Sequence, residues 1–281
     1  MEAAKPSRTA LRVALRRAAH QIYDERPLVF EDPLAVTILG RQYADDLKKT
    51  ATRLGKPFSV ALRAWLVGRS RYAEDCLARA YEGGVRQYVL LGSGLDTFGC
   101  RNVYPGLRVF EVDHPATQAW KLQLMERNGI SAPDSLTLVP VDFERDDLRE
   151  RLREVGFDLR APAFFAWLGV VPYLTLEAFR QTLEFVAERT AGSGVVMDYG
   201  QPREALPVLE RMGRDSMASR VELAGEPFQL FFNEGEMAAE LAGFCEGEDL
   251  GTGELNARYF AERRDQLKVR GTASRIVSAW L

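Results

Sequence analysis

Polar residues and glycines follow three short apolar segments of this chain, at positions where they could contact a ligand. Gly92 and Gly94 come directly after "QYVLL" in the stretch "QYVLLGSGLDTFGCR". Glycines let a ligand approach the backbone closely, but a tight turn between a strand and a helix also uses glycine. The dinucleotide-binding pattern GxGxxG is incomplete, because Thr97 stands where its third glycine would be. The glycines alone therefore leave both interpretations open.

Acids follow the next two apolar segments. "LRVFEVDHP" ends in Glu111 and Asp113, about twenty residues beyond Gly92, which is the spacing at which a carboxylate reaches the hydroxyls of a ribose. Asp142 and Phe143 end the third segment, "LTLVPVDF", where the acid could accept from an adenine amino group and the ring could pack on the base. Alternatively, each acid begins the helix that follows it, as an N-cap.

An alternating α/β framework would bring these residues together. Apolar segments of strand length occupy 87–91, 108–112, 136–141, 163–168, 194–198 and 274–280, and helical patterns at 117–128, 148–155, 176–190 and 234–242 lie between most of them. Strands that alternate with helices predict a mainly parallel sheet covered on both faces. Such sheets bind ligands at the carboxyl ends of their strands. We expect an α/β domain over residues 85–281.

The preceding residues, 1–84, have a helical pattern and predict an N-terminal cap integrated with this domain. Helices are expected over 7–20 and 60–81, and Asp32 with Pro33 suits the start of a short helix that ends at Gly40. A basic cluster in the first of these helices would equally fit a solvated helix face. Its members are Arg12, Arg16 and Arg17.

The composition is that of an ordinary globular protein. The formal net charge is -3, without a basic stripe, so we expect no nucleic-acid partner. The three cysteines are far apart and form no CxxC pair, so neither a disulfide framework nor a metal site is expected. No apolar run approaches about 18 residues, so we expect no membrane partner and a cytoplasmic location.

Several of these segments resemble one protein family. "GRSRYAED", "YVLLGSGLDTFGCR", "VFEVDHP", "VPVDFERDDL" and "FFAWLGVVPYLT", with "SRTA" and "EDPLA" near the N-terminus, are similar to class I S-adenosylmethionine-dependent methyltransferases of the leucine carboxyl methyltransferase-like family. The resemblance covers nearly the whole chain. It implies S-adenosyl-L-methionine as the cofactor. It also implies a Rossmann-like sheet that is mainly parallel, with an antiparallel C-terminal strand.

The resemblance also implies a role for six positions. They are Arg69 for the cofactor carboxylate, Gly92 and Gly94 for its methionine part, Asp113 for the ribose, and Asp142 with the Phe143 backbone for the adenine. Arg71 is an alternative partner for the carboxylate, but residues two apart lie about 200° apart on a helix, so only one of the two arginines faces the site. Many relatives carry a glutamate where this chain has Leu168, and any role of that acid is in doubt here.

Transfer of a methyl group from a sulfonium mainly requires that nucleophile, methyl group and sulfur are aligned, and orientation alone can lower the activation barrier by roughly 7–11 kcal/mol. A carboxylate nucleophile needs no base, and the chain has only two histidines, His20 and His114. We therefore expect O-methylation, at a carboxyl or a hydroxyl group, of a small molecule or a terminal carboxylate. We assign no catalytic residue. Tyr173 and Tyr199 follow strands and could line the substrate pocket, although ordinary packing is the favoured explanation for each taken singly.

Two other classes of function fit parts of the sequence. A nicotinamide-dependent oxidoreductase would explain the glycines and the acid at Asp113, but not the missing third glycine. A non-catalytic, cofactor-binding pseudoenzyme would explain Leu168 at a position that is acidic in many relatives.

Overall fold

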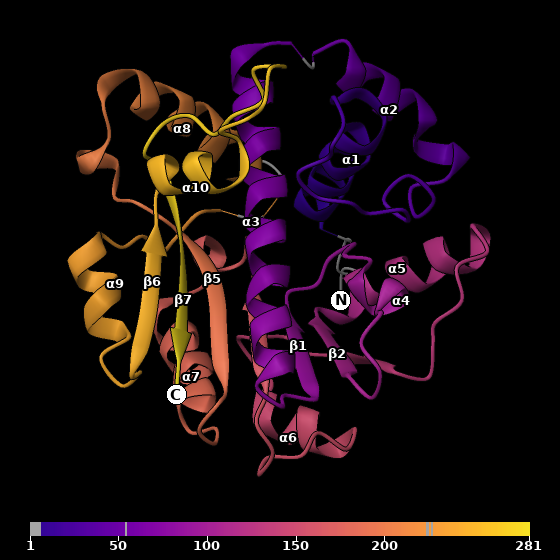
Figure 1. Ribbon diagram of the computed structural model, residues 1–281, viewed down its shortest axis with the longest axis vertical. Coiled ribbons are helices and arrows are strands. Elements are labelled where there is room, and N and C mark those ends of the chain that lie inside the picture. The colour runs from indigo at the N-terminus through magenta and orange to yellow at the C-terminus, as the bar shows by residue number, and fades with distance from the viewer. Residues whose placement is uncertain (1–6, 54, 223–224, 226) are drawn as a thin grey trace.

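The computed structural model describes residues 7–53, 55–222, 225 and 227–281 (Figure 1). These residues include one seven-stranded sheet with the strand order β3-β2-β1-β4-β5-β7-β6. The strands are β1 Gln87–Leu91, β2 Arg108–Asp113, β3 Leu136–Pro140, β4 Phe164–Trp167, β5 Gly194–Gly200, β6 Glu246–Leu250 and β7 Ser274–Trp280. Strands β1 to β5 are parallel, whereas β7 runs antiparallel to both of its neighbours. The predicted sheet is thus confirmed, including its antiparallel C-terminal strand.

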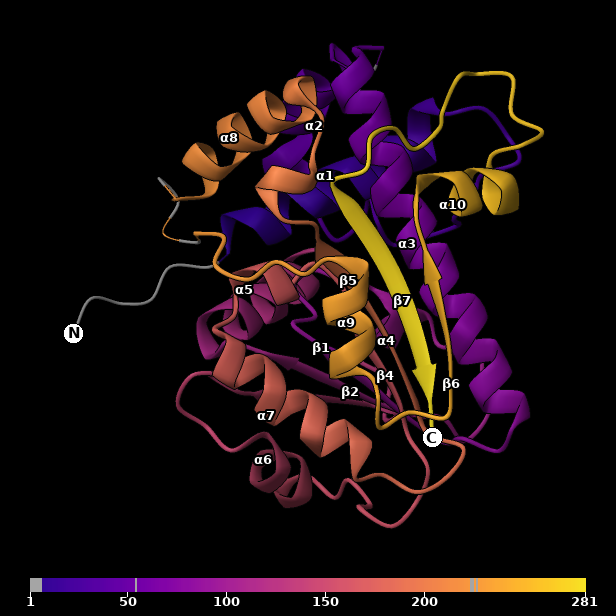
Figure 2. The ribbon, with the colours of Figure 1, turned by 90° about the vertical axis from the view of Figure 1, so that its left-hand side faces the viewer.

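Helices cover both faces of this sheet (Figure 2). They are α1 Arg8–Tyr23, α2 Ala44–Ala51, α3 Pro57–Glu82, α4 Phe98–Arg101, α5 Pro115–Arg127, α6 Leu148–Glu154, α7 Leu176–Ala187, α8 Val208–Glu222, α9 Glu234–Glu240 and α10 Thr252–Tyr259. The described residues also form three short 3-10 helices: η1 Arg41–Tyr43, η2 Val171–Tyr173 and η3 Arg203–Ala205. None of the helices in the described part of the chain is both long enough and apolar enough to cross a bilayer.

The central strands are apolar on both faces because both faces are buried. Tyr88 and Leu90 of β1 belong to a hydrophobic cluster that includes side chains of α3. Val89 and Leu91, the alternate residues of the same strand, belong to a second cluster that includes side chains of α7. The sheet is therefore the middle layer of the molecule, and the positions of its strand ends are fixed by packing on both sides.

The short helix predicted before Gly40 is not present, because residues 33–40 form turns. Asp32 does not cap a helix there. Its Oδ1 accepts a hydrogen bond from the backbone N–H of Leu34 at 3.2 Å, and its Oδ2 accepts one from the side chain of Arg17. The carboxylate thus combines one local contact, within a turn, with an ion pair to α1.

Candidate cofactor-binding site

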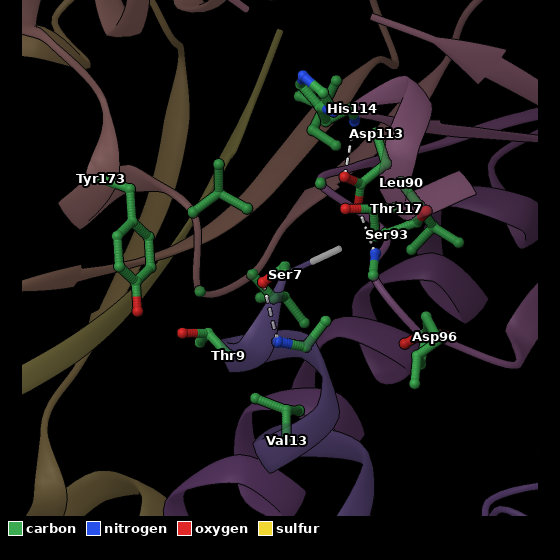
Figure 3. A pocket seen from close by; sticks show the side chains of 18 of the residues that line it. Ser7, Thr9, Val13, Leu90, Ser93, Asp96, Asp113, His114, Thr117 and Tyr173 are labelled. Carbon is green, nitrogen blue, oxygen red and sulfur yellow. Dashed lines mark hydrogen bonds between the residues drawn. The ribbon is translucent and has the colours of Figure 1, made fainter. Parts of the chain in front are cut away.

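A cavity of about 470 Å³ lies beyond the carboxyl ends of β1, β2, β3 and β4 (Figure 3). All six positions singled out in the sequence line this cavity: Arg69, Gly92, Gly94, Asp113, Asp142 and Phe143. A face of α1 forms a further wall. Tyr173 lies on the opposite side of the cavity from Asp113 and Ser93. The fold thus gathers the candidate residues at one edge of the sheet, as the parallel strands predict.

The glycine turn after β1 is tied to the end of β2. The backbone N–H groups of Gly92 and Ser93 both donate to the carbonyl oxygen of Val112, at 2.8 and 3.0 Å. Gly92 has φ +69°, and a Cβ atom built on it would lie 2.3 Å from a methyl group of Val170. The turn itself therefore requires glycine at this position. It also leaves the backbone bare on the cavity side, so the two interpretations of the glycines are compatible.

Ser93 adds a polar group to this turn. Its Oγ is buried and has no hydrogen-bond partner among the described residues, although Ser93 lines the cavity. Buried hydroxyl groups are seldom left unpaired. The unpaired hydroxyl is therefore compatible with a polar ligand at the turn.

Asp113 is held at the cavity edge by two backbone hydrogen bonds. Its Oδ2 accepts from the N–H of Gly94 at 2.6 Å, and its Oδ1 accepts from the N–H of His114 at 2.7 Å. Burial raises the pKa of Asp113, and these two hydrogen bonds partly oppose that effect. Each carboxylate oxygen can accept a second hydrogen bond. The N-cap of α5 is His114, whose Nδ1 accepts from the N–H of Ala116 at 3.2 Å, so the alternative that Asp113 caps this helix is wrong.

Asp142 and Phe143 lie just beyond the end of β3. Asp142 does not begin the next helix, because α6 has Asp147 as its N-cap. Instead, Asp142 Oδ1 accepts from the N–H of Glu144 at 3.1 Å within the loop. Phe143 is half-buried and packs against the hydrophobic cluster beneath the strand ends. The acid and the aromatic residue are thus held by separate contacts at the cavity wall.

Arg69 lines the cavity from α3 and is paired with an acid that the sequence did not point to. Its Nη1 donates to Asp198 Oδ2 at 2.7 Å, and Asp198 Oδ1 accepts from the N–H of Gly169 at 2.5 Å. A Cβ atom on Gly169, which has φ +72°, would lie 2.8 Å from Arg69 Nη2, so the guanidinium rests against bare backbone. Arg71 is exposed and pairs with Asp75 at 2.8 Å, outside the cavity. Only one of the two arginines therefore faces the site, as helix geometry predicts.

Leu168 also lines the cavity, at the position where the resemblance places a glutamate in many relatives. The parallel register of β4 and β5 pairs Trp167 with Met197, so the next residues along, Leu168 and Asp198, are neighbours across the sheet. A carboxylate is therefore present beside this position, but it comes from the following strand.

Arg17 is a further residue of the site that sequence reasoning missed. The sequence pattern around Arg17 fits a solvated helix face, yet this residue is only 4% exposed and lines the cavity. Its Nη1 donates to Asp96 Oδ2 at 2.7 Å, and its Nη2 donates to Asp32 Oδ2 at 2.5 Å. Burial alone would raise the pKa of Asp96, but the charges of Arg17 and Arg101 outweigh burial and lower it to about 2. Asp96 is thus ionised at neutral pH.

The remaining candidates divide between the cavity and the core. Tyr173 and His114 line the cavity. Tyr199 does not, because it is buried in the core with its hydroxyl donating to Asp249 at 2.6 Å. His20 is also buried away from the cavity, and its Nδ1 is 2.7 Å from Asp24. Of the two histidines, only His114 is therefore at the site.

Comparison with known proteins identifies similar sequences. The family model for leucine carboxyl methyltransferase matches residues 10–187. A "putative S-adenosyl-L-methionine-dependent methyltransferase" of Bacillus subtilis is 31% identical over 289 residues, which cover 93% of this chain and 93% of that protein. A protein of the same description from Mycobacteroides abscessus is 34% identical over 208 residues, covering 73% of this chain and 67% of its own length.

Solved structures with the same fold are more distant in sequence. A DUF574 family protein from Streptomyces avermitilis has a TM-score of 0.58 and 19% identity, covering 87% of this chain and 94% of that structure. A methyltransferase structure from Thermobifida fusca, titled as putative, has a TM-score of 0.58 and 14% identity, covering 98% of this chain and 95% of its own. At these identities the likeness shows the fold.

Proposed function

The chain belongs to the leucine carboxyl methyltransferase family and is an S-adenosylmethionine-dependent methyltransferase, and from this premise we propose that it methylates oxygen. The acceptor atom would belong to a carboxyl or hydroxyl group of a small molecule or a terminal carboxylate. The sheet is the Rossmann-like sheet of class I methyltransferases. Cofactor binding is supported by the single cavity that the glycine turn and the ends of β2 and β3 line. The observation that supports an oxygen nucleophile such as a carboxylate, which needs no base, is that His114, the histidine at this cavity, already uses its Nδ1 as an acceptor.

Six residues of this cavity would hold the cofactor. The proposed contacts are Arg69 with the carboxylate, Gly92 and Gly94 with the methionine part, Asp113 with the ribose hydroxyls, and Asp142 with the Phe143 backbone at the adenine. The chemistry of these groups suits the cofactor. Asp113 has unused acceptor capacity on both oxygens, and the Ser93 hydroxyl offers a polar group beside the bare turn. When bound, the cofactor supplies a methyl group that is already activated on a sulfonium.

The first 84 residues would act as a cap over this cofactor, integrated with the α/β domain of residues 85–281. Two contacts support the proposal. Residues of α1 line the cavity, and α3 contributes Arg69 and Ser70 to it. Apolar side chains of α3 also belong to the hydrophobic cluster on one face of the sheet. Removal of the cap would therefore expose both the cavity and part of the core.

A carboxylate oxygen is the preferred nucleophile because it needs no base, whereas a hydroxyl or an amine usually needs help in losing a proton. His114 is the histidine that lines the cavity, and its Nδ1 already accepts from the backbone of α5. The acceptor would lie toward Tyr173, on the opposite side of the cavity from Asp113 (Figure 3). Gln229 of the connector after α8 also lines the cavity and lies beside Tyr173, because its Nε2 donates to the carbonyl oxygen of Tyr173 at 2.9 Å. Glu226 of this connector lies outside the described residues.

Transfer of a tritiated methyl group from S-adenosylmethionine tests the proposal. The purified protein would be incubated with a panel of acceptors that carry carboxyl, hydroxyl, amino or thiol groups. Methyl esters release volatile methanol in mild base, whereas methyl ethers do not, so base treatment separates the two kinds of oxygen acceptor. We expect label only in products from oxygen acceptors. Label confined to amino or thiol acceptors would contradict O-methylation while leaving the methyltransferase assignment intact.

A further inference from the structure

Helix α1 contacts the glycine turn directly, so it is more than a cover over the cavity. Four residues at positions i, i+3, i+4 and i+7 of this helix line the cavity: Ala10, Val13, Ala14 and Arg17. This spacing places them on one face of the helix. A Cβ atom built on Gly94 would lie 3.1 Å from the Cβ atom of Ala10, so the backbones of helix and turn approach closely.

Arg17 makes a second contact with the turn, two helical turns further along α1. Its guanidinium bridges two acids from different segments, Asp96 at 2.7 Å and Asp32 at 2.5 Å. The hydroxyl of Thr97 donates to Asp32 Oδ1 at 2.6 Å, which closes a ring of polar contacts. The side chains of Arg17 and Asp32 are 5% and 0% exposed. A charged group buried to this extent needs its partners, because an unpaired buried charge is costly.

Asp96 is the residue through which this ring reaches the cofactor turn. Its backbone N–H donates to the carbonyl of Ser93 at 2.8 Å, and this contact closes the turn. Its Oδ1 accepts from the N–H of Phe98 at 2.7 Å at the start of α4. The carbonyl oxygen of Asp96 also accepts from Lys121 of α5. Asp96 is therefore tied to Arg17 through its side chain and to Ser93 of the glycine turn through its backbone.

We propose that Arg17, oriented by Asp32, is a positioning residue that couples the docking of α1 to cofactor binding at the glycine turn. This inference rests on the proposed cofactor site. The coupling is reciprocal: whatever strengthens the docking of α1 strengthens cofactor binding, and the cofactor strengthens the docking of α1 in return. Asp32 does not itself line the cavity. A change at Asp32 therefore acts on the cofactor only through other residues.

A second buried ion pair, which joins the segment after α1 to α3, provides a matched control. Arg63 of α3 donates from Nε and Nη2 to Asp24, directly after α1, at 2.6 and 2.7 Å. The two side chains are 5% and 6% exposed. This pair resembles that of Arg17 and Asp32 in burial and in fixing the position of α1, but neither residue lines the cavity.

The test is calorimetric titration of the full-length protein with S-adenosylhomocysteine, compared among Arg17→Met, Asp32→Asn and Arg63→Met. Coupling between two sites typically changes the affinity at one of them by about 5- to 150-fold. We therefore expect Arg17→Met and Asp32→Asn each to lose at least about five-fold in affinity. Arg63→Met should lower thermal stability but leave the affinity of the folded protein unchanged. Arg17→Lys should recover part of the loss, because an ammonium lacks the planar fork that reaches both acids.

Hydrogen exchange measures the reverse direction of the coupling. S-adenosylhomocysteine should slow amide exchange in residues 8–23 of the wild-type protein, and should slow it less in Asp32→Asn. If Arg17→Met does not fold, Asp32→Asn carries both measurements. Equal affinity losses for the Arg17, Asp32 and Arg63 variants, or no loss at Asp32, would show that the ring is purely structural and overturn the inference. Failure of the wild-type protein to bind S-adenosylhomocysteine would instead refute the cofactor site, and the inference with it.

Discussion

Replacement of Asp113 by alanine removes one carboxylate with two sets of contacts. Toward the protein, the carboxylate accepts from the N–H groups of Gly94 and His114, at 2.6 and 2.7 Å. Toward the cavity, it would accept from the ribose hydroxyls of the cofactor. The substitution therefore changes both stability and affinity, and the two effects must be measured separately.

The expected loss of affinity follows from the charged hydrogen bonds that Asp113→Ala removes. Hydrogen bonds to charged groups contribute roughly 1.5–3 kcal/mol, which corresponds to about ten- to a hundred-fold in dissociation constant. The loss of stability should be smaller, about 1 kcal/mol. Water can reach the two freed N–H groups at the cavity edge. Removal of a carboxylate whose pKa is raised by burial also relieves some of the cost of burying its charge.

The assay is calorimetric titration with S-adenosylhomocysteine, accompanied by urea unfolding of each variant. Asp134→Ala is the control, because Asp134 is exposed, precedes β3 and does not line the cavity. We expect the control to bind as the wild-type protein does. Unchanged affinity in a folded Asp113→Ala protein would refute the assignment of Asp113 to the ribose.

Three further predictions concern the same cavity. Arg69→Gln should weaken S-adenosylhomocysteine binding by at least about ten-fold, since charged hydrogen bonds contribute roughly 1.5–3 kcal/mol, whereas Arg71→Gln should change it little; the reverse ranking in a titration would move the carboxylate contact to Arg71. Gly92→Ala should reduce both thermal stability and binding, because it places a Cβ atom at φ +69° and 2.3 Å from Val170; normal melting and binding would contradict this account of the turn. Burial raises the pKa of Asp113, so its carboxylate becomes protonated at a higher pH than that of an exposed aspartate. The affinity for S-adenosylhomocysteine, measured by calorimetry, should therefore begin to fall at this higher pH as the solution is acidified. Because the raised pKa favours the protonated carboxyl in the folded state, the contribution of Asp113 to the free energy of unfolding should be more favourable at low pH than at high pH. If the loss of affinity at acidic pH persists in Asp113→Asn, Asp113 is not its source.

The sequence predicted the strands best where apolar residues run without interruption. The predicted bounds 87–91 and 274–280 are those of β1 and β7. Strand β6, Glu246–Leu250, was not predicted, because it is an edge strand with three acids and pairs only with β7. Its side chains are mostly exposed, so the apolar pattern that reveals a buried strand is missing. Helices α2, α8 and α10 were not predicted either.

The location of the site was predictable for a related reason. Parallel strands bring their carboxyl ends to one edge, so residues that follow the strands must meet there. The partners of the charged side chains were not predictable in this way. Arg17 pairs with Asp96, 79 residues away, and Arg69 pairs with Asp198, 129 residues away. The chain contains 40 acidic residues, and no local pattern marks which of them will face a given arginine.

The most direct test of the cofactor site is a crystal structure of the protein with S-adenosylhomocysteine. We predict that the ligand fills the cavity beyond β1, β2 and β3, with its ribose hydroxyls within hydrogen-bond distance of Asp113 and its adenine beside Asp142. Its methionine part should lie against Gly92 and Gly94, with the carboxylate at Arg69. S-adenosylhomocysteine bound outside this cavity, or bound in it with the ribose away from Asp113, would contradict the assignment.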